Sequence, residues 1–360
     1  MARTARKNIK AAQKNGTGPG IRAGYERAEG RTSGSRLQGP RGRGAEGRIL
    51  IHSFAKINFS IDVGEPREDG FHPVDMVMQQ IGFHDNVVVC FHPDKSKRPG
   101  EHEIRVTSNR PYLPTDRRNL AYRAAELMSL SCGTEIPGGV IEIQLHKMIP
   151  VAAGLAGGSG NAAAVIHGLN VLWRCRLSLK QIMEFCAQLG SDVPFCAMGQ
   201  AKLNRCLPRI VREDPMASAC ARATGTGTVL QPVKGIRMPA LIAKPRRGVS
   251  TAEVYRGLDS CRVETRPDND RLVHNMQDGD PEMFRDFVNV LECYTLHAYP
   301  EVDALKQTMA DTGARVTLMS GSGPTVFSLY DSMEDAKAAC EYLRGKRIEA
   351  YWTETLTDQV

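Results

Sequence analysis

The chain has 360 residues, of which 41% are hydrophobic and 24% are charged, and it carries a formal net charge of +7. This charge is unevenly distributed, because the first 48 residues hold 12 Lys and Arg against 3 Glu and carry +9, which leaves −2 for the remaining 312 residues. A nearly neutral body without a basic stripe argues against a nucleic-acid-binding protein, and its length is sufficient for two domains with ordinary cores.

Residues 1–48 are rich in Gly and Arg, poor in apolar residues and without periodicity, so we predict a disordered basic tail. The tail has no apolar segment of the kind found in secretory signals. A solvated tail, an organelle transit peptide, an RNA-contacting arm and a misassigned start codon all stay open for it. The ten cysteines form no C-x-x-C pair and no Cys/His cluster with zinc spacing, which indicates core thiols in a reducing compartment.

The stretch from Met148 to Trp173 contains no Asp, Glu, Lys or Arg. Its glycines, together with Asn161, His167 and Asn170, favour a buried loop and helix over a membrane span. We therefore expect a cytoplasmic protein, a monomer or a homodimer, without membrane contact. Weak contacts with nucleic acid are expected from the basic tail alone.

Residues 49–63 alternate apolar and polar side chains, which predicts a strand. Lys56 and Asn58 are two residues apart and therefore share one face of it. A lysine on a strand is usually solvated, but an asparagine on the same face, between small neighbours, favours the wall of a site.

The pair Asp69-Gly70 predicts a turn that presents Phe71 and His72 at a loop tip. An aromatic ring beside a histidine could stack on a flat ring and hydrogen-bond its edge; a partly buried Phe and an exposed His are the alternative. The elements predicted next are strands at 74–83, 86–92, 101–107 and 139–146, and a helix at 119–127.

Four glycines occur between residues 154 and 160, and apolar residues then recur at helical spacing from Ala162 to Trp173. The loop thus ends at a helix N-terminus, where unpaired amides and the helix dipole favour an anion. The sequence therefore predicts a phosphate-binding loop over residues 150–164.

Two known nucleotide-binding motifs and a simple turn are the alternatives for this loop. It is not a Walker P-loop, because no Gly-Lys-Ser/Thr closes it. Residues 158–163 match the dinucleotide form G-x-G-x-x-A, but Pro150 and seven further residues separate the predicted strand from Gly158, and the candidate acid Glu184 lies in a helical pattern. A flexible turn packed against a helix stays open on the loop alone.

Ser178 and Gln181 form a capping box that opens a helix ending at Gly190. Asp192 follows in the sequence Gly-Ser-Asp-Val-Pro-Phe, where Pro194 stiffens the chain and apolar neighbours hold the carboxylate in one direction. This context favours a functional carboxylate, and a structural helix cap is the alternative.

Residues 203–222 lack periodicity and indicate a loop insertion, and a new apolar strand at 239–243 follows the domain boundary. A second glycine-rich turn occupies residues 320–325. The C-terminal elements also predicted are a turn and helix start at 248–255, helices at 281–296, 300–310 and 333–344, and strands at 315–319 and 326–330.

Five segments, in this order, resemble motifs of the GHMP kinase superfamily. They are Ala55-Lys56-Ile57-Asn58, Asp69-Gly70-Phe71-His72, the glycine loop at 150–163, Leu189-Gly190-Ser191-Asp192-Val193-Pro194-Phe195, and Met319-Ser320-Gly321-Ser322-Gly323. The resemblance covers about residues 49–345, and the set is specific although each motif alone is weak.

The resemblance implies a two-domain α+β fold with the active site in the cleft between the domains. Residues 49–235 would form an N-terminal domain like domain 2 of ribosomal protein S5, and residues 236–360 a ferredoxin-like α/β sandwich. The activity implied is ATP-dependent phosphorylation, with Mg²⁺, of the 2-hydroxyl of a cytidine-diphosphate-linked methylerythritol. That reaction belongs to the non-mevalonate (MEP) pathway of isoprenoid precursor (isopentenyl diphosphate) synthesis.

The resemblance also implies roles for single residues. Asp192 would take the proton of the substrate hydroxyl, Lys56 would keep that carboxylate ionised, and Ser159 would contribute weakly to the Mg²⁺ bound with ATP. The residues implied to bind ATP are Pro150, Ala153, Gly154, Leu155, Ala156, Gly157, Gly158, Ser159, Gly160 and Asn161. The residues implied to bind the substrate are Asn58, Phe71, His72, Thr251, Tyr255, Ser320, Gly321, Ser322 and Gly323.

Four features depart from the family pattern. Gly160 replaces a serine that helps to bind magnesium in relatives, Ala156 replaces a glycine, Phe71 replaces a tyrosine, and residues 203–222 interrupt a usually compact region. The alternatives are therefore another GHMP enzyme, mevalonate- or homoserine-kinase-like, and a weakened paralogue that only binds nucleotide.

Overall fold

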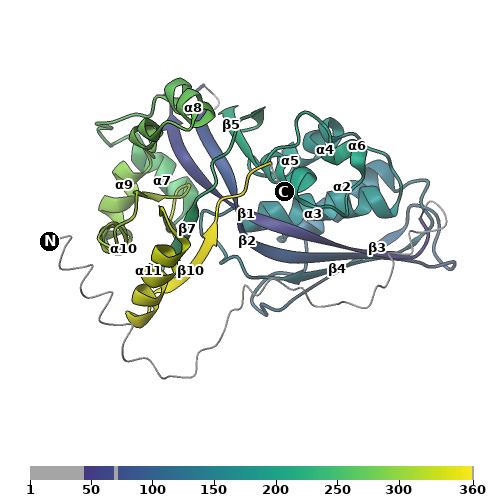
Figure 1. The fold of residues 1–360 in the computed structure, drawn as a ribbon. Helices are drawn as coiled ribbons and strands as arrows, with labels where there is room; N and C mark the ends of the chain where they lie inside the picture. Colours follow the sequence, from purple (N-terminus) through teal and green to yellow (C-terminus); the bar gives the residue numbers. More distant parts are fainter. Residues whose placement is uncertain (1–43, 69–71, 359–360) are drawn as a thin grey trace.

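The computed structural model describes residues 44–68 and 72–358, so the predicted disorder of residues 1–43 and the predicted role of Phe71 lie outside the described residues. The chain forms two lobes, each with a β-sheet and its own helices (Figure 1). Within the described ranges, no helix is long and apolar enough to cross a membrane.

The N-terminal sheet is built around the long strand β2, Val74–Pro93. Strand β2 pairs antiparallel with β1, β4 and β5, while β3 adds parallel to β4 and β6 adds antiparallel to β5. The other strands are β1 (Gly47–Val63), β3 (His102–Ser108), β4 (Gly139–His146), β5 (Cys220–Gly225) and β6 (Val229–Pro232). Strand β1 thus begins two residues before the predicted start of the N-terminal domain.

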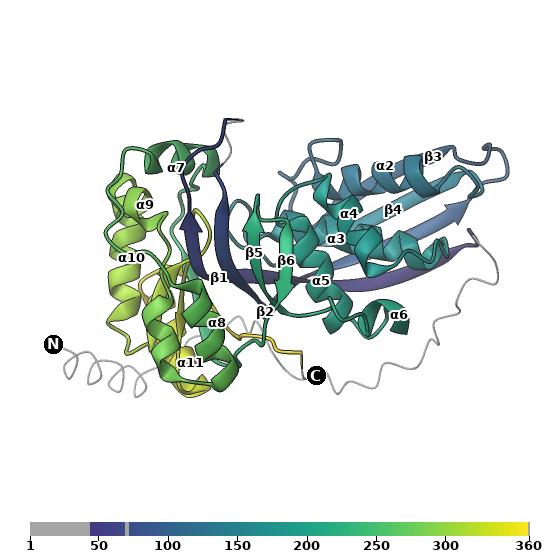
Figure 2. The same ribbon diagram turned by 90° about the horizontal axis from the view of Figure 1, so that it is seen from above.

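Helices cover one face of this sheet (Figure 2). Apolar side chains such as Ile51 of β1, Phe91 of β2 and Ile143 of β4 pack with the helices into one core. The helices are α2 (Leu120–Cys132), α3 (Gly157–Leu172), α4 (Leu179–Ala187), α5 (Val193–Leu203) and the single turn α6 (Arg209–Arg212). Helix α3 is buried almost throughout, because it packs against the sheet and against its neighbouring helices.

The C-terminal sheet has the antiparallel order β10-β7-β9-β8. Its strands are β7 (Pro239–Lys244), β8 (Val316–Met319), β9 (Val326–Leu329) and β10 (Glu349–Glu354). The helices of this lobe are α7 (Thr251–Leu258), α8 (Asn269–Asp278), the 3₁₀ helix η1 (Pro281–Asp286), α9 (Glu292–Ala298), α10 (Pro300–Ala310) and α11 (Met333–Gly345). Apolar residues of α7, α10 and α11 pack together in the core of this lobe.

A further apolar core joins the two lobes. Ile57 and Phe59 of β1 pack there with Ile242 of β7 and Phe327 of β9. The Phe59 ring also stacks on Phe287, with centroids 4.6 Å apart. Strands β1 and β2 extend beyond the helices of the first lobe toward the second lobe (Figure 2). In this part of β1, residues 55–61 are all buried, so both faces of the strand are covered.

Most predicted elements are confirmed, and the strand at 139–146 and the helix at 300–310 have the predicted bounds. The strands predicted at 74–83 and 86–92 are in fact the single strand β2, because the polar residues between them stay in the ladder. Sequence periodicity did not reveal β6, α8 or β10.

Three further predictions need correction. The helix predicted at 281–296 is divided into the 3₁₀ helix η1 and the helix α9, and residues 287–291 between them are not helical. Residues 203–222 are not a loop insertion throughout, since they contain α6 and the start of β5 and bury Leu207 and Val211 in the first core. The helix after the glycine loop begins at Gly157 rather than at Ala162, because the first helical turn contains the glycines themselves.

The buried His167 of α3 makes the stability of this packing depend on pH. Its Nε2 donates to the carbonyl oxygen of Ala197 on α5, at 3.0 Å, and burial lowers its pKa from 6.5 to about 4. The unfolded chain takes up this proton near pH 6.5 and the folded protein only near pH 4. Stability from the neutral ring is therefore complete above pH 6.5 and is lost as the pH falls towards 4, by about 3 kcal/mol in all.

His167→Gln should therefore flatten the fall of unfolding free energy below pH 6.5, as measured by urea denaturation from pH 7.5 to pH 4. The exposed His297 serves as a control, and His297→Gln should keep the slope of the parent protein. Equal slopes for the parent and His167→Gln would contradict the assignment.

Candidate active site

Two irregularities of β1 frame the first part of the site. The register of β1 against β2 shifts between Phe54 and Lys56 and again between Asn58 and Ser60. Such bulges re-aim side chains and are frequent next to active sites. Here they turn Lys56 and Asn58 toward the second lobe, where both side chains are buried.

Asn58 holds the lysine in place. Its Oδ1 accepts a hydrogen bond from Lys56 Nζ at 2.6 Å and a second one from the amide of Gly321 at 3.1 Å. Its Nδ2 points at the sulfur of Met76, at 3.4 Å. The expected common face of Lys56 and Asn58 is confirmed, and Asn58 acts as a link between the lysine and the second glycine turn.

Asp192 lies at the N-cap position of α5, but among the described residues its side chain makes no capping hydrogen bond. Its Oδ2 is instead 3.9 Å from Lys56 Nζ, and the exposed fractions of the two side chains are 33% and 5%. Burial raises the pKa of Tyr255 to about 12, and the negative charge of Asp192 contributes to the same shift. Asp192 is thus a carboxylate directed at a buried ammonium, which disfavours a purely capping role.

The first glycine loop leads directly into α3. Ala156 is the N-cap in the left-handed conformation, with φ of 55°, and the amide of Gly160 is the first to close a helical hydrogen bond, to the Ala156 oxygen at 2.8 Å. The amides before it lack helical partners, as at every helix N-terminus, and favour an anion. A left-handed φ is one that glycine adopts without strain, so it suits the glycine that the family pattern implies at position 156.

The two glycine turns meet backbone to backbone. Gly154 has a φ of 72°, and a Cβ there would collide with the carbonyl oxygen of Ser320. The Ser320 hydroxyl donates to the Gly154 oxygen at 3.0 Å, while Asn289 donates to the Gly321 oxygen at 2.8 Å. The fully buried Ser320 therefore joins the turns, which differs from its predicted contact with substrate.

An aromatic pair forms another wall of the site. The rings of His72 and Tyr255 lie 5.9 Å apart. Nδ1 of His72 donates to the Gly64 carbonyl oxygen at 2.9 Å, and Nε2 lies 3.5 Å from Oδ1 of Asp259. These contacts fix the histidine ring beside the tyrosine, as required of a pocket for a flat ring.

These groups line one cleft of about 1060 Å³, large enough for a nucleotide-sized ligand. Ten predicted site residues line it: Lys56, Asn58, His72, Gly154, Ser159, Asp192, Thr251, Tyr255, Gly321 and Ser322. Polar lining residues that were not predicted are Ser191, Thr226, Arg256 and Asp259. One of these could have been found, because Asp259, the C-cap residue of α7, follows Tyr255 by four positions and so lies on the same side of the helix.

Several residues predicted to bind ATP have side chains outside the cleft. Ala153 and Leu155 are buried in the core between the lobes, and Gly160 and Asn161 are buried within α3. Pro150, Ala156, Gly157 and Gly158 also do not line the cleft among the described residues, and neither does Gly323, which was predicted to bind substrate. Of the residues predicted to bind ATP, Gly154 and Ser159 are the two that line the cleft in the described part of the chain, and the role of the other amides stays a prediction.

A buried charged network that was not predicted supports the loop. Oδ1 of Asp85 on β2 accepts from the amides of Met148 and Ile149 at 2.7 and 2.8 Å. Its Oδ2 pairs with Lys147 Nζ, and both groups bond the side-chain amide of Asn161. Burial raises the pKa of Asp85, and the Lys147 charge opposes that shift. Asn161 thus anchors α3.

Comparisons with known proteins agree with this geometry. Residues 119–200 match the family model of the GHMP kinases N terminal domain, and residues 272–348 match that of the GHMP kinases C terminal domain. The chain is 41% identical over 298 residues to the 4-diphosphocytidyl-2-C-methyl-D-erythritol kinase of Alkaliphilus metalliredigens, covering 82% of this chain and 92% of that protein. The same enzyme of Bacillus pumilus is 42% identical over 317 residues, covering 87% and 98%.

Solved structures extend the comparison. A crystal structure of 4-(cytidine 5'-diphospho)-2C-methyl-D-erythritol kinase superposes with a TM-score of 0.66 at 29% identity, covering 85% of this chain and 99% of that one. The homoserine kinase of Cytophaga hutchinsonii gives 0.59 at 17% identity, covering 86% and 95%, and the L. major mevalonate kinase gives 0.58 at 12%, covering 88% and 98%. These last two show a shared fold alone.

The fold, the paired glycine turns and the Lys56–Asp192 pair define a kinase of the GHMP class. Within this class, the chain belongs to the family of 4-diphosphocytidyl-2-C-methyl-D-erythritol kinases.

The position of Gly160 yields a prediction. A Cβ there would come too close to the hydroxyl oxygen of Ser53, so Gly160→Ser should destabilise the protein by about 1–3 kcal/mol through overpacking. It should not lower the Mg²⁺ concentration needed for half-maximal rate, because the added hydroxyl points into the sheet. Ser53→Ala removes the obstructing oxygen, so the double variant should regain most of the lost stability.

Unfolding free energies from urea denaturation of the four proteins in this cycle measure the coupling. Gly158→Ser is the matched control, since Gly158 is exposed in the same turn and the nearest atom to an added Cβ is 3.7 Å away. A fully stable Gly160→Ser protein with a lowered Mg²⁺ requirement would refute the packing argument.

Proposed function

We propose that this kinase transfers the γ-phosphoryl group of ATP to the 2-hydroxyl of 4-diphosphocytidyl-2-C-methyl-D-erythritol, the compound named in its relatives. The observation that carries the proposal is the composition of the cleft, which contains the Lys56–Asp192 pair and the Tyr255–His72 ring pair. The first pair suits transfer to a hydroxyl, and the second suits a substrate with a flat base. This reaction would place the enzyme in the non-mevalonate pathway.

Phosphoryl transfer requires positioning and neutralisation of charge more than covalent help from the protein. The carboxylate of Asp192 takes the proton of the substrate hydroxyl as the oxygen attacks phosphorus. The ammonium of Lys56 keeps this carboxylate ionised and offsets the negative charge that develops. The free amides at the start of α3 bind the ATP phosphates.

The residues present fit a magnesium ion bound with ATP. The Asp192 carboxylate and the Ser159 hydroxyl both line the cleft, and Mg²⁺ in proteins is typically bound by one or two carboxylates, by water and by substrate phosphates. The ion would neutralise phosphate charge. In this proposal Gly160 contributes no ligand, because it is buried.

The cytidine would stack on Tyr255, with the edge of the base at His72. Nδ1 of His72 donates its proton to the carbonyl oxygen of Gly64. Nε2, which lies beside Asp259, is therefore the ring atom that can hydrogen-bond the base. Thr251 is held by a hydrogen bond of 2.8 Å to Ser322, which keeps the start of α7 against the second glycine turn. Phe71, the predicted second stacking ring, stays a prediction.

A substrate comparison tests the proposal. The purified full-length chain is assayed with ATP and the cytidine-linked substrate, mevalonate or homoserine. The value of kcat/KM for the cytidine-linked substrate should be higher by on the order of 100-fold, since stacking alone is worth roughly 1–3 kcal/mol per base. Preference for mevalonate or homoserine would replace the proposal with one of the related kinases.

The role of Asp192 predicts the outcome of its substitution. Asp192→Asn keeps the size of the side chain but cannot take a proton, so kcat should fall by about 10²–10⁴. The melting temperature and the binding of both substrates should change little, because the side chain makes no cap bond among the described residues. Single-turnover kinetics and thermal unfolding measure the two effects.

Lys56→Met tests the partner of Asp192. If the lysine works through the carboxylate, the double variant should lose far less activity than the product of the two single losses. If the two losses multiply, Lys56 and Asp192 act independently and the proposed pair is wrong. A fully active Asp192→Asn enzyme would contradict the proposed mechanism as a whole.

Tyr255→Ala should raise KM for the cytidine-linked substrate about tenfold or more, while KM for ATP stays unchanged. Tyr255→Phe keeps the ring and is the matched control, so it should retain nearly the parent value. Equal rises of both KM values in Tyr255→Ala would contradict the assignment of Tyr255 to the base pocket.

A further inference from the structure

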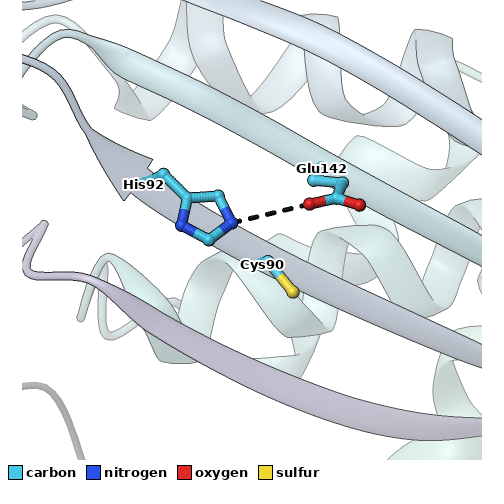
Figure 3. A group of neighbouring side chains, drawn as sticks. All are labelled: Cys90, His92 and Glu142. Atoms are coloured by element: carbon cyan, nitrogen blue, oxygen red, sulfur yellow. Dashed lines mark ion pairs between the residues drawn. The ribbon is translucent and has the colours of Figure 1, made fainter.

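The face of the N-terminal sheet opposite its helices carries a cluster of a thiol, an imidazole and a carboxylate (Figure 3). Cys90 and His92 are two residues apart on β2 and point to the same face, and Glu142 of β4 is the cross-strand partner of Cys90. Met76 of the same strand lines the cleft. It is 14 residues from Cys90, which corresponds to about 45 Å along an extended strand. The cluster is therefore separate from the catalytic site.

The three donor atoms already lie close together. The Cys90 sulfur, a ring nitrogen of His92 and a carboxylate oxygen of Glu142 are all within 4.8 Å of one another. Ligand atoms around tetrahedral Zn²⁺ are about 3.5 Å apart, given bonds of about 2.0–2.3 Å. Nε2 of His92 is 3.6 Å from Oε2 of Glu142, so small side-chain rotations would place all three around one ion.

A second carboxylate orients the histidine. Nδ1 of His92 lies 3.0 Å from Oε1 of Glu46, immediately before β1. Because a carboxylate only accepts, the Nδ1 atom beside Glu46 is a donor, which leaves Nε2, 3.6 Å from Oε2 of Glu142, as the ring nitrogen that can bind a cation. Metal-binding histidines are commonly oriented by a carboxylate in this way.

The surroundings decide the kind of ion. The Cys90 side chain is buried beneath the other two, and the exposed fractions of His92 and Glu142 are 45% and 33%, which leaves a side open to water. Arg48, the β1 partner of Cys90, is exposed, and its side chain hydrogen-bonds the thiol, so metal binding would displace this contact. Thiolate and imidazole ligands favour Zn²⁺ over Mg²⁺ or Ca²⁺, which take oxygen ligands.

We propose that Cys90, His92 and Glu142 bind Zn²⁺, with Glu46 as a positioning residue and water as the fourth ligand. The ion would link β2 to β4 and, through Glu46, to the start of β1. It would stabilise the N-terminal sheet and leave turnover in the distant cleft unchanged.

Titration of the full-length chain with Co²⁺ tests the site, under a non-chelating reductant and with excess Mg²⁺ to occupy oxygen-only sites. One equivalent of Co²⁺ should produce a thiolate-to-metal charge-transfer band and tetrahedral d–d bands, and Zn²⁺ should displace both. Cys90→Ser should abolish the charge-transfer band. His92→Ala, at a half-exposed position that the fold tolerates, should lose Co²⁺ binding, and Glu46→Gln should weaken it about 10–100-fold.

Matched controls use other residues of the same types. Cys206→Ser changes a half-buried thiol, and His146→Ala changes an exposed imidazole on β4, so both variants should keep the parent spectrum. Zn²⁺ should also raise the melting temperature of the parent protein but not that of His92→Ala, with kcat unchanged in both. Absence of a charge-transfer band in the parent protein, or its persistence in Cys90→Ser, would overturn the proposal.

Discussion

The contact between the two glycine turns is the constraint on which the site depends. Residue 154 belongs to the first lobe and residue 320 to the second, and their backbones approach so closely that a side chain at Gly154 would collide with the Ser320 carbonyl. This contact brings the Gly321 amide to Asn58, and Asn58 in turn holds Lys56. The position of the Lys56 ammonium is thus set by packing between lobes, although the lysine itself is on β1.

The first of these turns rests on a buried pair of charges. Removing one member of such a pair typically costs 3–5 kcal/mol, because the other charge is left uncompensated. Asp85 binds the backbone at Met148 and Ile149, so its loss would also free the chain leading into the loop. The ammonium of Lys147 lies beneath the first turn of α3, only 3.2 Å from where a Cβ on Gly157 would be. Its charge is compensated by Asp85, so the amides and dipole of the helix N-terminus remain the feature that favours phosphate there.

The sequence predicted those parts of the site that depend on local patterns. The shared face of Lys56 and Asn58 follows from strand alternation, and the carboxylate of Asp192 stood out from its apolar neighbours. Contacts between distant segments could not be predicted from the sequence. Asp85 and Lys147, for example, are 62 positions apart, and neither lies in a motif. The Cys90–Glu142 neighbourhood likewise depends on the register of β2 against β4, which composition and spacing do not encode. Local periodicity also failed where glycine starts a helix, since glycine predicts a loop on propensity alone.

The distance between Lys56 and Asp192 has a consequence for the mechanism that we propose. At 3.9 Å, the Lys56 ammonium and the Asp192 carboxylate are too far apart for a hydrogen bond but close enough for a strong charge interaction. A shorter ion pair would occupy the carboxylate oxygen to which we assign the substrate proton. Asn58 prevents this, because it binds the ammonium at 2.6 Å and holds it back from the carboxylate. The one-third exposure of Asp192 leaves its oxygens accessible from the cleft, as the proposed role of this carboxylate as a base requires.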